Sequence, residues 1–218
     1  MPLKRKIILE LTNCLKETLP GWEAQSRLEP EMRKQMRQQA AEEAKAKESA
    51  VLLLMYPKEN DLMLVFIQRS EYVGIHSSQI AFPGGRYEDV DIDFEATALR
   101  ETWEEIGIPP ADVNILGKLT SLYVPPSNFN IHPFVGMLSK EPTFILDPLE
   151  VAGVFTAPLS IFFNATTLQQ KTITFRDGSD ILVPCYNVEN KIIWGATSMI
   201  LNELLEVYSI AAAKVGLL

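Results

Sequence analysis

Cysteine and histidine are scarce in this sequence, which limits the disulfides and metal sites that it can build. Only two cysteines, Cys14 and Cys185, and two histidines occur among 218 residues. Both cysteines lie in apolar-patterned stretches and at no metal-ligand spacing. We therefore expect them to be small core residues in a reducing compartment.

Long hydrophobic runs are also missing. No stretch approaches the ~20 apolar residues that a membrane span needs. The N-terminus is basic at Lys4, Arg5 and Lys6, but Glu10 interrupts the apolar run that follows. We therefore expect neither a signal peptide nor a membrane anchor, and by default a cytoplasmic location.

The chain has no excess of basic residues, no internal repeat and no low-complexity tract. It carries 20 Lys and Arg against 28 Asp and Glu, a net charge of −8. This balance argues against nonspecific binding to nucleic acid or to an anionic membrane. A hydrophobic content of 47% and a charged content of 22% are typical of a globular domain with extensions.

The negative charge is concentrated in one segment. Residues 86–107 hold eight acids and two arginines, which is −6 of the total of −8. We predict a helix here, beginning near Phe94 and ended by Gly107. At ~100° per residue, three acids share one side of this helix: Glu101, Glu104 and Glu105. The opposite side is predicted to be buried, and it comprises Leu99, Thr102, Trp103 and Ile106.

Three acids on one side of a helix repel one another. The i, i+4 pair of Glu101 and Glu105 alone is unfavourable by roughly 0.2–0.5 kcal/mol. A divalent cation would reverse this effect, and Mg²⁺ takes one or two carboxylates together with waters and substrate phosphates. The alternative is a solvated acidic face. The upstream Gly-Gly turn, Arg100 and Gly107 favour the metal site, with Glu101, Glu104 and Glu105 as ligands.

Residues 100–108 read RETWEEIGI and follow Gly85. They resemble the signature of the Nudix hydrolases, G-x5-E-x7-R-E-U-x-E-E-x-G-U, in which U is a bulky apolar residue. The second half matches at every fixed position except Thr102. The first half departs from it, because Ile92 stands where the isolated Glu belongs and the loop is one residue longer. Asp91 or Asp93 would replace that acid, although Asp93 is also well placed as a helix N-cap.

A second signature lies directly upstream. Residues 69–85 resemble R-S-x-x-L-x-x-H-x-G-Q-V-x-F-P-G-G, the pattern of the coenzyme A pyrophosphatase branch of the Nudix family. The matching residues are Arg69, Ser70, His76, Gln79, Phe82, Pro83, Gly84 and Gly85. Val73 and Ile80 are mild substitutions, and Ser78 replaces a glycine. Two adjacent signatures in the right order are more specific than either alone.

The resemblance implies cleavage of the diphosphate of coenzyme A or its derivatives, with Mg²⁺ or Mn²⁺ as cofactor. The products would be 3′,5′-ADP and 4′-phosphopantetheine or its acyl form. The implied catalytic residues are Arg100, Glu101, Glu104 and Glu150, the last as a further acid that starts a strand. The implied substrate-binding residues are Arg69, Gly84, Gly85 and Arg86.

Several alternatives stay open. The substrate could be ADP-ribose, NADH or a dinucleoside polyphosphate, or the domain could bind a nucleotide without catalysis. Arg69 would contact a phosphate or make a structural salt bridge. For His76 we favour a structural hydrogen bond over a general acid. Asn128 and Phe129 would border the site, or their loop would merely connect two strands.

The element order predicts an α/β layered domain with a mixed sheet, and the resemblance names it a Nudix-type α/β/α sandwich. We expect an N-terminal helical extension over residues 1–48 and the Nudix domain over 49–218. Hairpins are predicted over 51–68 and 171–188, a strand pair interrupted at Gly117 over 113–124, and strands over 131–138 and 151–156. A last helix should follow Trp194. The helix over 3–18, ended at Pro20-Gly21, would serve a homodimer interface or cap its own domain.

Overall fold

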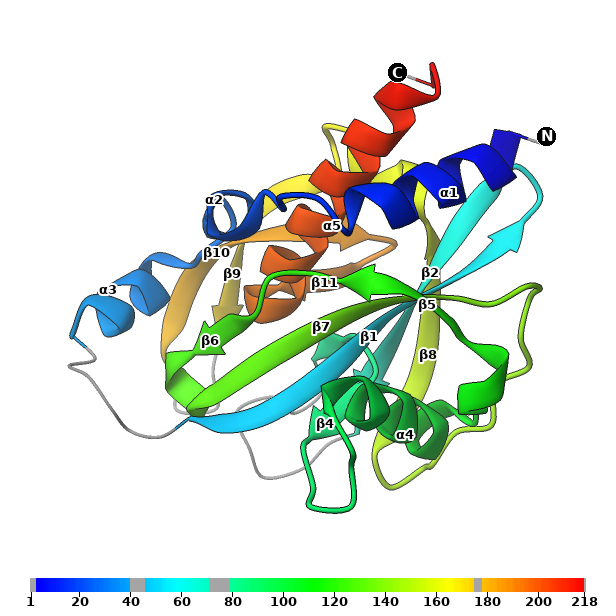
Figure 1. Ribbon diagram of the computed structural model, residues 1–218. Helices are drawn as coiled ribbons and strands as arrows, with labels where there is room; N and C mark the ends of the chain where they lie inside the picture. Colours follow the sequence, from blue (N-terminus) through cyan, green and yellow to red (C-terminus); the bar gives the residue numbers. More distant parts are fainter. Residues whose placement is uncertain (1–2, 40–45, 71–78, 175–177, 218) are drawn as a thin grey trace.

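A computed structural model describes residues 3–39, 46–70, 79–174 and 178–217, and it arranges them as a mixed sheet between helices (Figure 1). The helices are α1 (Leu3–Cys14), α2 (Gly21–Ser26), α3 (Glu31–Gln39), α4 (Phe94–Ile106) and α5 (Gly195–Lys214). The strands of the main sheet are β1 (Lys47–Lys58), β2 (Asp61–Arg69), β3 (Ile80–Ala81), β4 (Gly84–Arg86), β5 (Asn114–Lys118), β6 (Leu122–Val124), β7 (Phe129–Met137) and β8 (Val151–Pro158). A smaller sheet contains β9 (Leu168–Thr174), β10 (Asp180–Val188) and β11 (Lys191–Trp194).

Strand β1 is the centre of the main sheet. It runs parallel to β7 and antiparallel to β2 and β4, and β8 pairs with β2. Its start at Lys47 lies two residues before the domain start expected at residue 49. The mixture of parallel and antiparallel pairs confirms the predicted mixed sheet.

Both faces of β1 are buried because helices cover both sides. Leu52 and Leu54 belong to the core under α4, whereas Leu53 and Met55 belong to the core shared with α1 and α5. Side chains of a strand alternate between faces, so the continuous apolar run of β1 fills two cores at once. The α/β/α layers are therefore confirmed, and Cys14 and Cys185 are buried free thiols as expected.

The N-terminal helices are tied to α5 by a buried carboxylate. Glu203 of α5 is 0% exposed and accepts hydrogen bonds from the backbone N–H groups of Gly21 and Thr120 and from the Gln25 amide. Three donors meet this charge, which satisfies the requirement for burying a carboxylate. The segment before β1 consequently shares its core with the C-terminal helix.

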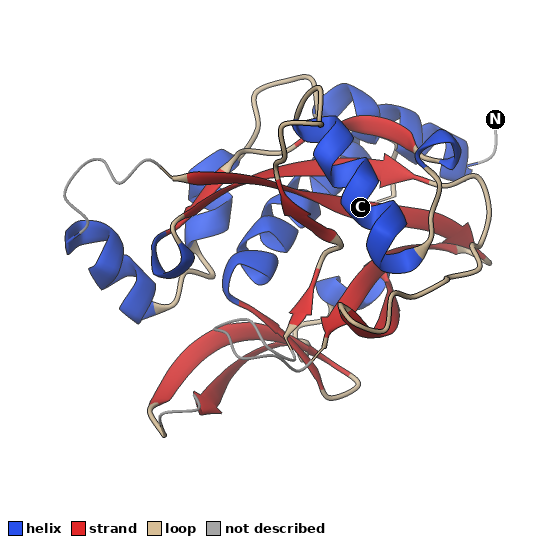
Figure 2. Ribbon diagram, turned by 90° about the horizontal axis from the view of Figure 1, so that it is seen from below, coloured by secondary structure: helices blue, strands red, loops and turns tan. Residues whose placement is uncertain are grey.

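The hairpin of β9 and β10 forms the smaller sheet with β11, and Figure 2 shows this sheet standing apart from the main one. Its turn passes Gly178, which has a φ of 82°, as the predicted hairpin over 171–188 requires. Residue 177 lies outside the described residues. Within the described parts of the chain, no helix is long and apolar enough to cross a membrane.

Two local expectations were wrong. The Pro83-Gly84-Gly85 segment was expected to be a turn, but Gly84 and Gly85 pair with β1 as part of β4. Gly117 was expected to interrupt a strand pair, but β5 continues through it with a bulge. A Cβ on Gly117 would lie 2.8 Å from the Leu15 Cβ, so the glycine instead permits the close approach of the α1 end. That helix ends at Cys14, and Pro20-Gly21 opens α2.

Substitution of Gly84 should destabilise the fold. Its φ is 144°, and an added Cβ would lie 2.3 Å from the carbonyl oxygen of Ala50. We expect Gly84→Ala to lower the free energy of unfolding by about 2–4 kcal/mol, because strained backbone and overpacking act together. Urea denaturation measures this. Gly153→Ala is the control, since a Cβ there meets nothing within 4 Å; equal stability of the two variants would contradict the packing of β4 against β1.

Candidate active site

Helix α4 presents the acidic side chains and has well-defined ends. Asp93 caps the N-terminus by accepting a 2.8 Å hydrogen bond from the Ala96 N–H. Gly107 ends the helix at a φ of 73°, with its N–H bonded to the Trp103 carbonyl. Both ends agree with the sequence prediction. The two caps therefore fix the start and the end of the helix that carries the acids.

The buried side of α4 agrees with the prediction at Thr102 and Ile106, both 0% exposed, and differs from it at two other positions. Trp103 was expected to be buried but is 55% exposed, whereas Glu105, expected on the open acidic side, is 1% exposed. Ala98 and Thr102 face the core, and the Thr102 hydroxyl donates to the Ala98 carbonyl at 2.7 Å. The helix is thus rotated about its axis relative to the prediction, because Glu105 finds partners inside the protein.

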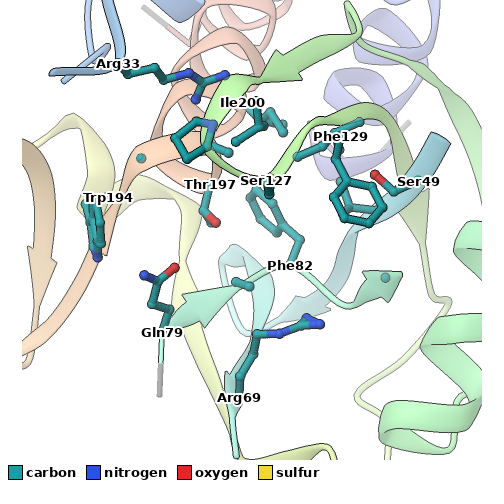
Figure 3. A pocket seen from close by; sticks show the side chains of 18 of the residues that line it. Arg33, Ser49, Arg69, Gln79, Phe82, Ser127, Phe129, Trp194, Thr197 and Ile200 are labelled. Carbon is teal, nitrogen blue, oxygen red and sulfur yellow. The ribbon is translucent and has the colours of Figure 1, made fainter. Parts of the chain in front are cut away.

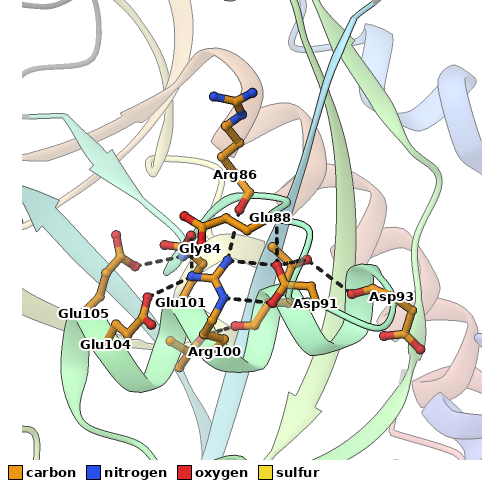
Figure 4. A network of polar contacts seen from close by, with 12 residues as sticks. Gly84, Arg86, Glu88, Asp91, Asp93, Arg100, Glu101, Glu104 and Glu105 are labelled. Atoms are coloured by element: carbon orange, nitrogen blue, oxygen red, sulfur yellow. Dashed lines mark hydrogen bonds and ion pairs between the residues drawn. The ribbon is translucent and has the colours of Figure 1, made fainter.

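Arg100 is the hub of the polar network in Figure 4. Its guanidinium donates twice to Asp91, at 2.8 and 2.9 Å, and once each to Glu101 at 3.0 Å and Glu104 at 2.8 Å. It also donates to the Arg86 carbonyl oxygen at 3.1 Å. These carboxylates, Asp91 first, raise the pKa of Arg100 further above its usual range. One cation therefore holds three acids and the end of β4 in place.

Asp91, rather than Asp93, is the acid that the structure brings to Arg100. Asp91 is buried, and its carboxylate also accepts from the Glu88 N–H and the Thr97 hydroxyl. The hydrogen bond from Arg100 is the main cause that lowers the pKa of Asp91 to about 2. Ile92, which stands at the signature's Glu position, is 90% exposed. The extra loop residue thus moves the paired acid one position upstream.

Glu105 is a buried carboxylate held by β4. It accepts a 2.8 Å hydrogen bond from the Gly84 N–H, and Arg69 lies 3.7 Å away from it. Burial raises the pKa of Glu105 to about 8, although Arg69 and the Gly84 N–H act in the opposite direction. Glu101 and Glu150 add to the rise. Arg69 therefore makes the salt bridge that was one of its two predicted roles.

Glu101 lies directly against Gly85. A Cβ at Gly85 would come within 2.3 Å of the Glu101 carboxylate oxygen, so a larger residue would displace this carboxylate from its present position. Burial raises the pKa of Glu101, and Arg100 opposes the rise. Glu104 and Glu150 raise it further. Glu101 is therefore coupled electrostatically to Glu104 and to Glu150, although Glu150 lies far along the chain, directly before β8.

These carboxylates suit a divalent cation in their chemistry. Hard oxygen ligands are those that Mg²⁺ and Mn²⁺ prefer, and mutual repulsion among buried carboxylates is what a cation relieves. Among the described residues, however, no three Asp, Glu, His or Cys side chains already converge on one point. Arg100 holds Glu101 and Glu104, while Gly84 and Arg69 hold Glu105. A cation bound by one or two of these acids fits this arrangement.

A cavity of about 430 Å³ opens on the other side of β4. All four predicted substrate-binding residues line it: Arg69, Gly84, Gly85 and Arg86. Figure 3 shows Arg69 and Arg33 entering from opposite sides, with Phe82 and Phe129 between them. The loop before β7 borders this cavity through Ser127 and Phe129, whereas Asn128 instead accepts a hydrogen bond from Tyr123. His76 and Ser78 lie outside the described residues.

Sequence reasoning missed the cavity walls that come from distant parts of the chain. Met32 and Arg33 come from α3, Ile181 from β10, and Trp194 from the end of β11. Local periodicity carries no signal for such contacts.

Comparison with known proteins identifies the family. The model of the NUDIX domain family matches residues 46–171. The Nudix hydrolase NudL of Yersinia pestis is 35% identical over 147 residues, which cover 67% of this chain and 73% of that protein. NudL of Yersinia pseudotuberculosis matches with the same figures. The chain therefore belongs to the Nudix family.

Solved structures agree with this fold. The Nudix hydrolase RenU of M. smegmatis matches with a TM-score of 0.53 and 12% identity, over 84% of this chain and 94% of that one. A MutT/nudix family protein of Enterococcus faecalis matches with a TM-score of 0.50 and 18% identity, over 80% and 66%. The match to the family model and to NudL makes the protein a Nudix pyrophosphohydrolase, a class of enzyme that generally requires a divalent metal ion.

The ion pair of Asp91 and Arg100 predicts a pH-dependent stability. The pKa of Asp91 is about 2 in the folded protein and 3.8 ordinarily, so the pair contributes about 2 kcal/mol above pH 4 and loses this as the pH falls toward 2. We expect Asp91→Asn to be about 2 kcal/mol less stable at pH 7 by denaturant unfolding, with a gap that narrows in acid. Asp93→Asn is the control, because Asn caps a helix as well as Asp. A gap that does not change with pH would show that another contact causes it.

Proposed function

We propose that this Nudix hydrolase cleaves the diphosphate of coenzyme A or its derivatives, releasing 3′,5′-ADP and 4′-phosphopantetheine or its acyl form. The observation that carries the proposal is the dual role of the Phe82–Arg86 segment. On one side, the Gly84 N–H binds the Glu105 carboxylate and Gly85 lies against the Glu101 carboxylate. On the other side, the same two glycines line the cavity. Residues 82–85 are the end of the segment, residues 69–85, that resembles the coenzyme A branch.

Charge governs the chemistry at this position. The oxygens of a diphosphate are anionic and repel an attacking water. Glu101, Glu104 and Glu105 are the carboxylates that would hold Mg²⁺ or Mn²⁺, one or two of them as direct ligands, and the ion would neutralise that charge and lower the pKa of the attacking water. Arg100 holds Glu101 and Glu104 in orientation.

The proton of the attacking water goes to a carboxylate of the same cluster. One of the α4 glutamates or Glu150 accepts it. Glu150 lies close enough to affect the pKa of both Glu101 and Glu105, and the Ser70 N–H donates to its carbonyl at 2.9 Å. Arg69 and Arg86 border the cavity and offer guanidinium groups to the phosphate oxygens.

A second substrate class is favoured by one specific departure. Ser78 replaces the glycine of the coenzyme A signature, which allows ADP-ribose, NADH or a dinucleoside polyphosphate as the substrate. Release of 3′,5′-ADP from coenzyme A, compared with release of AMP from ADP-ribose or NADH, separates the two classes.

Glu104→Gln should abolish most of the activity. The substitution removes a carboxylate from the cluster, and its side chain is half exposed, so folding should change little. We expect a loss of at least about a hundredfold in coenzyme A turnover, with products identified by chromatography. Glu95→Gln in the first turn of α4 should retain wild-type turnover, because Glu95 lies away from the cluster.

Two results would contradict the proposal. Full activity of Glu104→Gln would remove Glu104 from the mechanism. Turnover of no member of a nucleotide panel with Mg²⁺ or Mn²⁺ would instead support a domain that binds a nucleotide without catalysis.

A further inference from the structure

The cavity beside β4 is completed by parts of the chain outside residues 46–171, the segment matched by the family model. Helix α3 contributes Met32, strand β10 contributes Ile181, and the start of α5 contributes Ala196 and Ile200. These walls lie outside the segment that the family model matches. The chemistry of their side chains indicates which part of a substrate they would contact.

The walls are mainly apolar and uncharged. Most of the residues that line the cavity are apolar, including Met32, Phe82, Phe129, Ile181, Trp194 and Ile200. Among the described residues that line the cavity, none is acidic and the charged ones are arginines. A volume of about 430 Å³ is within the range of small-molecule sites. The interior therefore suits an apolar group better than an anionic one.

The arginines divide the cavity into a charged edge and an apolar interior. Arg69 and Arg86 lie at the edge beside β4, next to the carboxylate cluster. Arg33 lies at the far side, where it donates to the Tyr123 carbonyl and to the Met199 sulfur. The backbone and side chains of the protein thus already engage Arg33. We consequently expect the diphosphate of a substrate at the β4 edge of the cavity. The uncharged part of the substrate that is attached to the diphosphate would then lie in the apolar interior.

Only one half of an acyl coenzyme A can enter such an interior. The nucleoside half carries a 3′-phosphate, and burial of an anion among apolar side chains is strongly unfavourable. The pantetheine half carries amides, which match the neutral polar side chains of Gln79, Ser127 and Thr197 on the cavity wall. Its acyl chain is wholly apolar and gains from leaving water.

We propose that the cavity binds the acyl chain of a coenzyme A thioester and makes this enzyme prefer acylated over free coenzyme A, an inference that rests on the proposed function. Ile181, Trp194, Ala196 and Ile200 are the specificity-determining residues. The diphosphate stays at β4, so the chemistry is unchanged and only substrate affinity varies with chain length.

A series of thioesters tests the proposal. We expect kcat/KM of the full-length protein with Mg²⁺ to rise from coenzyme A through acetyl, butyryl, hexanoyl and octanoyl coenzyme A, by up to about fourfold per buried methylene. Calorimetry of the same ligands in EDTA gives binding without turnover, and the dissociation constant should fall along the series.

Two neighbouring residues of β10 supply matched variants. Ile181 lines the cavity, whereas Leu182 points to the opposite face and is 63% exposed. Ile181→Asn should flatten the dependence of the dissociation constant on chain length, whereas Leu182→Asn should keep the wild-type dependence. Ala196→Trp fills the cavity from another element and should also flatten it, so a folding defect of one variant leaves the test intact.

The outcomes separate the inference from the proposed function. Binding that tightens with chain length, without any turnover, would support the cavity assignment and overturn the coenzyme A hydrolase. Turnover of coenzyme A with affinity independent of chain length would overturn the acyl pocket and retain the hydrolase. Equal effects of Ile181→Asn and Leu182→Asn would also overturn the acyl pocket.

Discussion

The ion pair of Arg100 with Asp91 is the interaction on which the active site depends. Through it, one guanidinium joins the acidic loop, helix α4 and the carbonyl of Arg86 in β4. The same guanidinium spaces Glu101 and Glu104, so their repulsion is balanced by a cation of the protein itself.

Strand β4 contacts the carboxylate cluster and also lines the cavity. Gly84 has a backbone conformation and a contact with β1 that only glycine allows, and its N–H holds Glu105. Gly85 leaves space for Glu101 on the same side. The absence of two side chains therefore lets the carboxylates approach the backbone that lines the cavity. Gly84 and Gly85 therefore connect the carboxylate cluster with the cavity.

Features of α4 set by nearby residues were predictable, and those set by distant residues were not. The N-cap Asp93 and the C-cap Gly107 depend on neighbours within a few positions, so the sequence indicated both. The burial of Glu105 depends on an N–H donated from 21 residues upstream, which helical periodicity does not contain. The exposure of Trp103 follows from the resulting rotation of the helix. The choice of Asp91 over Asp93 likewise depends on where Arg100 lies in space.

Metal binding by the carboxylate cluster is the central claim, and manganese tests it directly. Crystals soaked in Mn²⁺ should show an anomalous difference peak beside Glu101, Glu104 and Glu105, and calorimetry should register uptake of the ion. Absence of both the peak and the uptake would contradict the assignment of these glutamates as the metal site.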